Sequence, residues 1–110
     1  MPDSGDVVLI DFPGVIETKR RPAVVLSTVE YHAARPDVIV GLLTAQVSKA
    51  TASTDHLLTN WRGANLSKPT AFRSYVWTAP RTAILSHLGK LDAADWRAVQ
   101  SCLTRAMKFS

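Results

Sequence analysis

Three consecutive basic residues, Lys19, Arg20 and Arg21, stand directly before Pro22. Cations held this close repel one another, and an anion bound among them would relieve that repulsion through charge-assisted hydrogen bonds. The residue before a proline is biased toward an extended backbone, so Arg21 is not expected to be helical. The cluster predicts an anion site, and the competing interpretation is the solvated tip of a loop.

A second polar group follows the apolar run 38–43, where Thr44 and Gln46 bring a hydroxyl and an amide to the predicted end of a strand. Side chains at such a rim can present hydrogen-bond donors to a phosphate or a base. Threonine and glutamine at a strand end also bond to the local backbone, so both interpretations stay open at this point.

The sequence carries no spacing typical of a metal site. His32, His56 and His87 are isolated, and Cys102 is the single cysteine, which excludes a disulfide within the chain. A metal would need ligands gathered from three loops. We expect neither a metal nor a cofactor, and we retain His56, which lies between a loop and an apolar segment, as the candidate histidine.

Length and composition describe one ordinary globular domain. The 110 residues are 46% hydrophobic and 20% charged, which fits a single domain over 1–110. No apolar stretch approaches the roughly 20 residues that span a bilayer. The N-terminus is acidic and polar, unlike a secretory signal. We therefore expect a cytoplasmic protein with no membrane contact.

The basic charge is concentrated in the second half of the chain. Residues 1–60 hold five basic and seven acidic residues, whereas residues 61–110 hold eight basic and two acidic ones. The net charge of +4 and the pI near 9.6 thus arise from one half. This asymmetry favours a polyanionic partner such as nucleic acid, although a merely basic, solvated surface gives the same numbers.

Five or six short strands precede one helix in the pattern of the chain. The predicted strands are 7–12, 23–27, 38–43, 71–77 and 82–85, with a short apolar piece at 56–58. The predicted loops are 13–21, 28–37, 45–55 and 59–70. The second and third strands are continuous apolar runs, which predicts burial on both faces or a tightly closed barrel.

The hydrophobic period changes near residue 92, and helical spacing predicts an amphipathic helix over about 92–108. Asp92 is placed to cap this helix, and the charges of Asp95, Arg105 and Lys108 match its dipole. The fold class that follows is mainly β with α: a small β-barrel with the C-terminal amphipathic helix packed outside.

The order of these segments resembles the MazF/PemK toxins of type II toxin–antitoxin systems. Gly5–Phe12, followed by a polar loop into Arg21–Ser27, looks like the opening of that family. Leu43–Gln46 resembles its second motif, an apolar strand that closes on a threonine. Asn65–Thr70 and Leu88–Asp92 are similar to later segments of the family. The likeness covers nearly the whole chain in the right order.

The resemblance implies a homodimeric SH3-like barrel and a sequence-selective endoribonuclease that needs no metal. Carried over by position, it makes Arg21 and Thr44 the catalytic residues. In this family a ribose 2′-hydroxyl attacks the adjacent phosphate and leaves a cyclic phosphate and a free 5′-hydroxyl. The site must then hold a cation and donors where negative charge develops. The expected RNA-binding residues are Lys19, Arg20, Gln46, His56 and Arg73.

The chain departs from the family at a strand carboxylate that several members place beside an arginine. One alignment puts Val76 and Thr78 at the two places, and another puts Arg73 and Tyr75 there. Neither supplies an acid. A general base would come from His56, Asp11 or a water.

Three functions follow from this sequence. The first is a toxin that cleaves single-stranded RNA. The second is a non-catalytic member that binds RNA or a protein, which the missing acid favours. The third is a gyrase poison of the CcdB type, although residues 105–110 lack the Trp-Gly-Ile tail of that group.

The resemblance also implies a cognate antitoxin as a partner, with a flexible acidic segment that covers the RNA groove. We expect Trp61, Arg62 and the loops 13–21 and 45–55 to lie near that groove.

Overall fold

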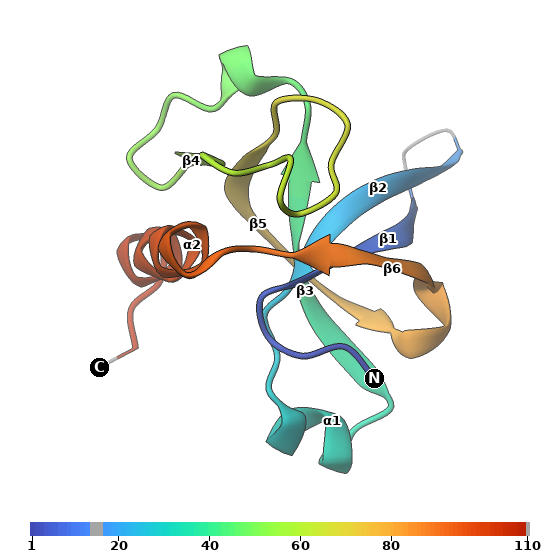
Figure 1. Cartoon of the computed structure of the whole chain (residues 1–110). Helices are drawn as coiled ribbons and strands as arrows, with labels where there is room; N and C mark the ends of the chain where they lie inside the picture. The colour runs from blue at the N-terminus through green and yellow to red at the C-terminus, as the bar shows by residue number, and fades with distance from the viewer. Residues whose placement is uncertain (14–16, 110) are drawn as a thin grey trace.

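A curled antiparallel sheet carries a long helix on its outside (Figure 1). The computed structural model describes residues 1–13 and 17–109. The strands are β1 (Asp6–Pro13), β2 (Thr18–Val25), β3 (Asp37–Thr44), β4 (His56–Leu57), β5 (Ala71–Pro80) and β6 (Ile84–Lys90). The helices are α1 (Val29–Ala34) and α2 (Ala93–Ala106), and short 3₁₀ turns lie at Val47–Lys49 and Arg81–Ala83.

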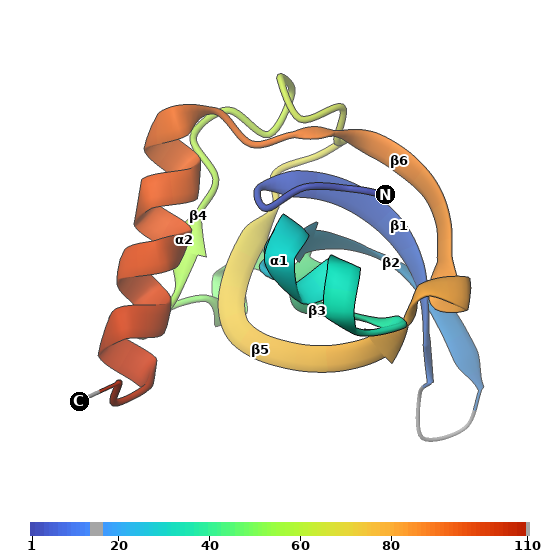
Figure 2. The same cartoon turned by 90° about the horizontal axis from the view of Figure 1, so that it is seen from below.

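The six strands lie in the order β4-β5-β3-β2-β1-β6, with every pair antiparallel. Figure 2 shows the sheet curling around α1, which lies across one end of the curl, while α2 stands outside beside β4 and β5. The outer strands β4 and β6 do not pair with each other in the described residues, so the sheet is a half-barrel. The prediction of a mainly β fold with a C-terminal helix is confirmed.

Both faces of the sheet are buried along the apolar parts of β1, β2 and β3, as the continuous apolar runs predict. Val8, Val25 and Val40 belong to one cluster inside the curl. Their neighbours along the chain, Val7 and Val24, belong to a second cluster with Val99 and Cys102 of α2. Successive residues of a strand point to opposite faces, so β1, β2 and β3 each contribute to both clusters.

Helix α2 begins where the sequence predicts. The Asp92 carboxylate accepts a hydrogen bond from the backbone N–H of Asp95 at 2.8 Å, which is the expected N-cap arrangement. The helix ends at Ala106, within the predicted span. Among the described residues, neither helix has the length and apolar character to cross a membrane.

The basic cluster lies on a strand, and the prediction of a loop over 13–21 is wrong at residues 18–21. Lys19 pairs with Phe12, Arg20 with Asp11 and Arg21 with Ile10 in the β1–β2 ladder. Backbone hydrogen bonds to β1 hold this polar segment extended. The segment lacks the apolar side chain at every second position that identifies a half-buried strand in a sequence. Residues 14–16 of the predicted loop lie outside the described residues.

Other boundaries also differ from the sequence prediction: β2 ends at Val25 and not at residue 27, and β5 continues past residue 77 to Pro80. The predicted loop 28–37 contains α1, which starts where the Thr28 hydroxyl accepts from the Tyr31 N–H at 3.3 Å. The strand predicted at 82–85 begins at Ile84 and runs to Lys90. The polar middle of β6 is exposed and pairs with β1 through the backbone. The hydrophobic pattern of the sequence therefore gives little indication of this strand.

Candidate functional site

Arg21 and Thr44 lie across from each other where β2 and β3 separate. The last backbone pair of these strands is Ala23 with Leu42, and two further steps along each strand reach Arg21 and Thr44. Steps of two keep a side chain on the same face of a sheet, so both side chains point to the face of Ala23 and Leu42. The strand register therefore brings the two residues together.

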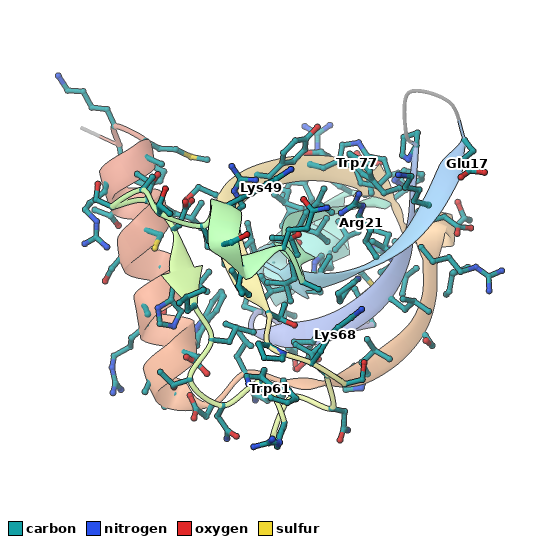
Figure 3. The ribbon with its side chains drawn as sticks, turned by 90° about the horizontal axis from the view of Figure 1, so that it is seen from above. Glu17, Arg21, Lys49, Trp61, Lys68 and Trp77 are labelled. Carbon is teal, nitrogen blue, oxygen red and sulfur yellow. The ribbon has the colours of Figure 1, made fainter. Side chains whose placement is uncertain are left out.

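Two cavities open on either side of this pair, with volumes of about 470 and 420 Å³. Arg21, Leu43 and Thr44 line both of them and form a shared wall. Figure 3 views the end of the curl opposite α1, and there Arg21 lies between Trp77 on one side and Lys68 on the other. A group bound against Arg21 can thus extend in two directions.

The first cavity is strongly basic. Lys19, Arg20 and Lys68 join Arg21 in its lining, and no Asp or Glu is among the described residues that line it. Neutral polar side chains complete the rim, contributed by Asn65, Ser67 and Thr70. Four cations lining one cavity attract a polyanion, because each phosphate placed there relieves their mutual repulsion.

The second cavity differs in character. Its lining combines two aromatic rings, Phe12 and Tyr75, with the Gln46 amide and the Arg73 guanidinium. The described lining holds no acid or histidine. Apolar rings with a few convergent hydrogen-bonding groups are typical of a site for a flat, partly polar ligand.

Arg21 is half-buried, and its Nε has no hydrogen-bond partner within the described part of the chain. A buried donor left without a partner costs free energy, so the Arg21 guanidinium would gain from an acceptor bound within its reach. Arg20 differs because its Nε lies 3.8 Å from an Asp11 carboxylate oxygen at the exposed surface. That pair is solvent-screened and weak.

The Thr44 hydroxyl is oriented by the chain that follows it. Its oxygen accepts a hydrogen bond from the backbone N–H of Gln46 at 3.1 Å. Because the oxygen acts as acceptor in this bond, its own hydrogen stays available to donate toward the cavities. Arg21 and Thr44 together offer a charged fork and a hydroxyl donor on one wall.

The segment that carries Lys68 is anchored at its start by Asp95 of α2. The Asp95 carboxylate accepts from the Thr59 N–H at 2.9 Å, the Thr59 hydroxyl at 3.0 Å, the Asn60 N–H at 2.9 Å and His56 Nε2 at 2.8 Å. Burial alone would raise the pKa of Asp95, but these hydrogen bonds outweigh it and lower the pKa below its ordinary value. A buried carboxylate thus stays charged and fixes the beginning of this loop.

The middle of the same loop is held against β6. Asn65 adopts a left-handed backbone with φ of 60°, and its Nδ2 donates to the Leu88 carbonyl at 2.8 Å. Beside it, the Ala64 carbonyl oxygen lies so close to Gly89 that an added Cβ would be 2.6 Å away. The two anchors place Ser67 and Lys68 at the first cavity.

The structure brings together six of the seven residues that the sequence predicts for this site. Arg21 and Thr44 line both cavities, Lys19 and Arg20 the first, and Gln46 and Arg73 the second. His56 is separated from them, because it bonds to Asp95 and lines neither cavity. Asp11, the other candidate base, is also outside both linings.

Trp61 and Arg62 do not line the cavities either. Trp61 packs on the apolar cluster that includes Val99 and Cys102 of α2. The Arg62 guanidinium lies 4.5 Å from the centre of the Trp61 ring. Sequence reasoning did not single out Lys68, Phe12 or the ring of Tyr75 as site residues. Two features of the sequence point to Lys68. It lies within Asn65–Thr70, a segment that resembles the family, and within the basic second half of the chain.

Comparisons with known proteins agree with this fold. The profile of the PemK-like, MazF-like toxins of type II toxin–antitoxin systems matches residues 3–107. No curated protein matches the sequence. An endoribonuclease in complex with its cognate antitoxin, from Mycobacterial species, superposes with a TM-score of 0.81 at 17% identity, covering 100% of this chain and 98% of that one.

Two further solved structures share the architecture. The Mycobacterium tuberculosis toxin MazF-mt6 gives a TM-score of 0.76 at 18% identity, over 92% of this chain and 94% of that one. The MazE–MazF structure from Deinococcus radiodurans gives 0.75 at 20% identity, over 99% and 97%. At such identities the likeness describes the fold.

Proposed function

Because this chain belongs to the PemK-like, MazF-like toxins of type II toxin–antitoxin systems, we propose that it is an endoribonuclease that cuts single-stranded RNA at the Arg21–Thr44 wall. The observation that carries the proposal is the shared lining of the two cavities, to which half-buried Arg21, with an unpartnered Nε, and the hydroxyl-bearing Thr44 both contribute. One phosphodiester seated on this wall has room for the strand to continue on both sides.

The chemistry proposed for this wall is internal transfer of a phosphate. A ribose 2′-oxygen forms a bond to the adjacent phosphorus, the bond from phosphorus to the 5′-oxygen breaks, and the products are a 2′,3′-cyclic phosphate and a 5′-hydroxyl. Negative charge grows on the non-bridging oxygens during this step. Arg21 supplies positive charge and directed donors to those oxygens, and the Thr44 hydroxyl adds another donor.

The linings of the two cavities offer few side chains that could transfer a proton. Neither cavity contains Asp, Glu or His among its described residues. The proton of the 2′-hydroxyl then passes to water, and the departing 5′-oxygen takes a proton from water. The acceleration arises mainly from electrostatic stabilisation at Arg21 and Thr44. The reaction proposed here requires no metal.

The same feature favours a second candidate function, a member of the family that binds RNA without cutting it. Such a protein would use the basic lining for phosphates and would show affinity that falls steeply with salt. Strand scission separates the two candidates.

The proposed partners follow from the family and from the basic cavity. We propose a cognate antitoxin with an acidic segment, since the solved relatives include one in complex with its cognate antitoxin and a MazE–MazF pair. We also propose a homodimer that acts in the cytoplasm, where its RNA substrate is found, with selectivity for particular RNA sequences.

The test is incubation of the purified protein with a mixed-sequence single-stranded RNA in EDTA. Wild type is expected to yield cyclic-phosphate and 5′-hydroxyl ends, and Arg21→Ala is expected to lower the cleavage rate about a hundredfold or more. Arg97→Ala is the matched control, because it removes the same charge from an exposed position on α2 outside both cavities.

Equal cleavage by Arg21→Ala and wild type would contradict the assignment of the site. Salt-dependent binding without scission by wild type would support the binding-only candidate instead.

A further inference from the structure

Strand β5 contains a bulge at the second cavity. Gly41 pairs with Val76 and Leu43 with Phe72, so two steps along β3 correspond to four along β5. Ser74 in this bulge has φ of 58°, an uncommon value for a residue with a side chain. Its hydroxyl donates to the Thr54 carbonyl at 2.6 Å, which holds the strained backbone in place.

The bulge sets the direction of the side chains on either side of Ser74. Arg73 and Tyr75 both line the second cavity, together with Ser74 itself. A bulge that re-aims side chains beside a cavity is a common feature of functional sites.

The Tyr75 ring is firmly supported and yet exposed. It packs against Phe12 in an edge-to-face arrangement with ring centres 5.7 Å apart, and Phe12 packs in the same way on Trp77 at 5.2 Å. Even so, 55% of Tyr75 is accessible to solvent. A large aromatic ring that packs on one neighbour and remains more than half exposed offers an apolar area that a flat partner can cover.

We propose that Tyr75 is the stacking platform for an unpaired nucleobase, held beside the phosphate that occupies the Arg21–Thr44 wall. The proposal rests on the proposed function for the position of that phosphate. Base stacking on an aromatic side chain requires a single strand, because the bases of a duplex are already stacked on one another.

The surroundings of the ring favour a base over other flat ligands. The Gln46 amide can donate to and accept from a base edge, and Arg73 supplies positive charge for the next phosphate. The cavity adjoins the wall shared with the basic cavity, so one strand passes from the cationic side to the aromatic side.

The test measures binding separately from cleavage. A 12-nucleotide deoxyribonucleotide strand lacks the 2′-hydroxyl and so cannot be cut by internal transfer, and an abasic strand of equal length keeps the phosphates but has no bases. Tyr75→Ala is expected to bind the base-containing strand about tenfold more weakly than wild type, and Tyr75→Phe to bind it as wild type does. Phe109→Ala is the matched control, an exposed aromatic outside both cavities.

The abasic strand supplies the second comparison. Wild type is expected to bind it about as weakly as Tyr75→Ala binds the base-containing strand, and Tyr75→Ala is expected to bind the two strands alike. Equal affinity of wild type for both strands would overturn the proposal without any variant. Unchanged affinity of a folded Tyr75→Ala would also overturn it, and so would equal loss in Tyr75→Phe, which would point to the hydroxyl instead of the ring.

Failure of the proposed function has a different signature. It would appear as absent RNA cleavage, or as cleavage that does not depend on Arg21, and neither result depends on the strand affinities of the Tyr75 variants.

Discussion

The roles proposed for Thr44 and Arg21 differ, because Thr44 supplies a hydroxyl and Arg21 supplies a positive charge. The oxygen of Thr44 is held by the Gln46 N–H at 3.1 Å, which turns the hydroxyl hydrogen toward other acceptors. Serine can make the same bonds, whereas valine keeps the shape of threonine and removes both of them. The contribution of the hydroxyl is therefore separable from that of the side-chain volume.

Thr44→Val is expected to lower RNA cleavage about a hundredfold, and Thr44→Ser by only a few-fold, because one donor to the developing charge is lost in the first variant and kept in the second. Cleavage rates at saturating RNA measure the effect. A rate for Thr44→Val equal to that of Thr44→Ser would show that the hydroxyl takes no part.

Arg21 and Thr44 were accessible to sequence reasoning because each follows a recognisable strand motif. Tyr75 was not, since its position depends on the bulge at Ser74 and on packing against Phe12 of β1, a strand that does not pair with β5. Such contacts join residues far apart in the chain, and no local pattern encodes them. The local sequence around His56 favours a site residue, whereas its hydrogen bond to Asp95 of α2 determines where it lies.

At the scale of elements, the loop over residues 59–70 depends on contact with β6. The Ala64 backbone approaches Gly89 closely enough that a Cβ on residue 89 would be 2.6 Å from the Ala64 carbonyl oxygen. Backbone atoms cannot move aside as the end of a flexible side chain can. Gly89 thus permits the approach that positions Ser67 and Lys68 at the first cavity.

Gly89→Ala is expected to lower the free energy of unfolding by about 1 to 3 kcal/mol, because the added methyl group forces the loop away from the strand. Urea unfolding measures this change, with Ser86→Ala on an exposed position of the same strand as the control. Equal stability of the two variants would contradict the close packing of the loop on β6.

The strands and helices that the sequence predicts are those with strong apolar signals. The three apolar runs and the amphipathic helix fall at β1, β2, β3 and α2. The segments it misplaces are polar: the start of β2, the short helix α1 and the second half of β6. Pairing with β1 fixes the two strand segments, and an N-cap fixes the start of α1. The hydrophobic pattern of a sequence reveals neither interaction.

For the whole molecule, the pH dependence of stability involves two buried titratable groups that line neither cavity. Burial, together with the positive charge of Arg81, lowers the pKa of His32, whose Nε2 lies 2.6 Å from the Ser27 hydroxyl. A base with a lowered pKa binds fewer protons in the folded state than in the unfolded state. The Asp95 carboxyl, with its own lowered pKa, shows the same difference at more acidic pH.

The free energy of unfolding is therefore expected to fall as pH drops below 6.5, the ordinary pKa of histidine, and to fall again below 3.8, that of aspartate. Urea unfolding as a function of pH measures both losses. His32→Gln is expected to flatten the first and Asp95→Asn the second. Retention of the full first loss in His32→Gln would assign it to another histidine.

The hydrogen-bonded ladder between β2 and β3 ends early, and this affects which parts of the two cavities can change during evolution. Since pairing stops at Ala23 and Leu42, the two compartments beyond that point are bounded by separate segments: the loop before Thr70 on one side and the bulged strand after it on the other. Mutations can accumulate in either boundary without disturbing its counterpart. Descendants of this chain would then acquire new preferences through one flank while inheriting Arg21, the proposed catalytic residue, unchanged.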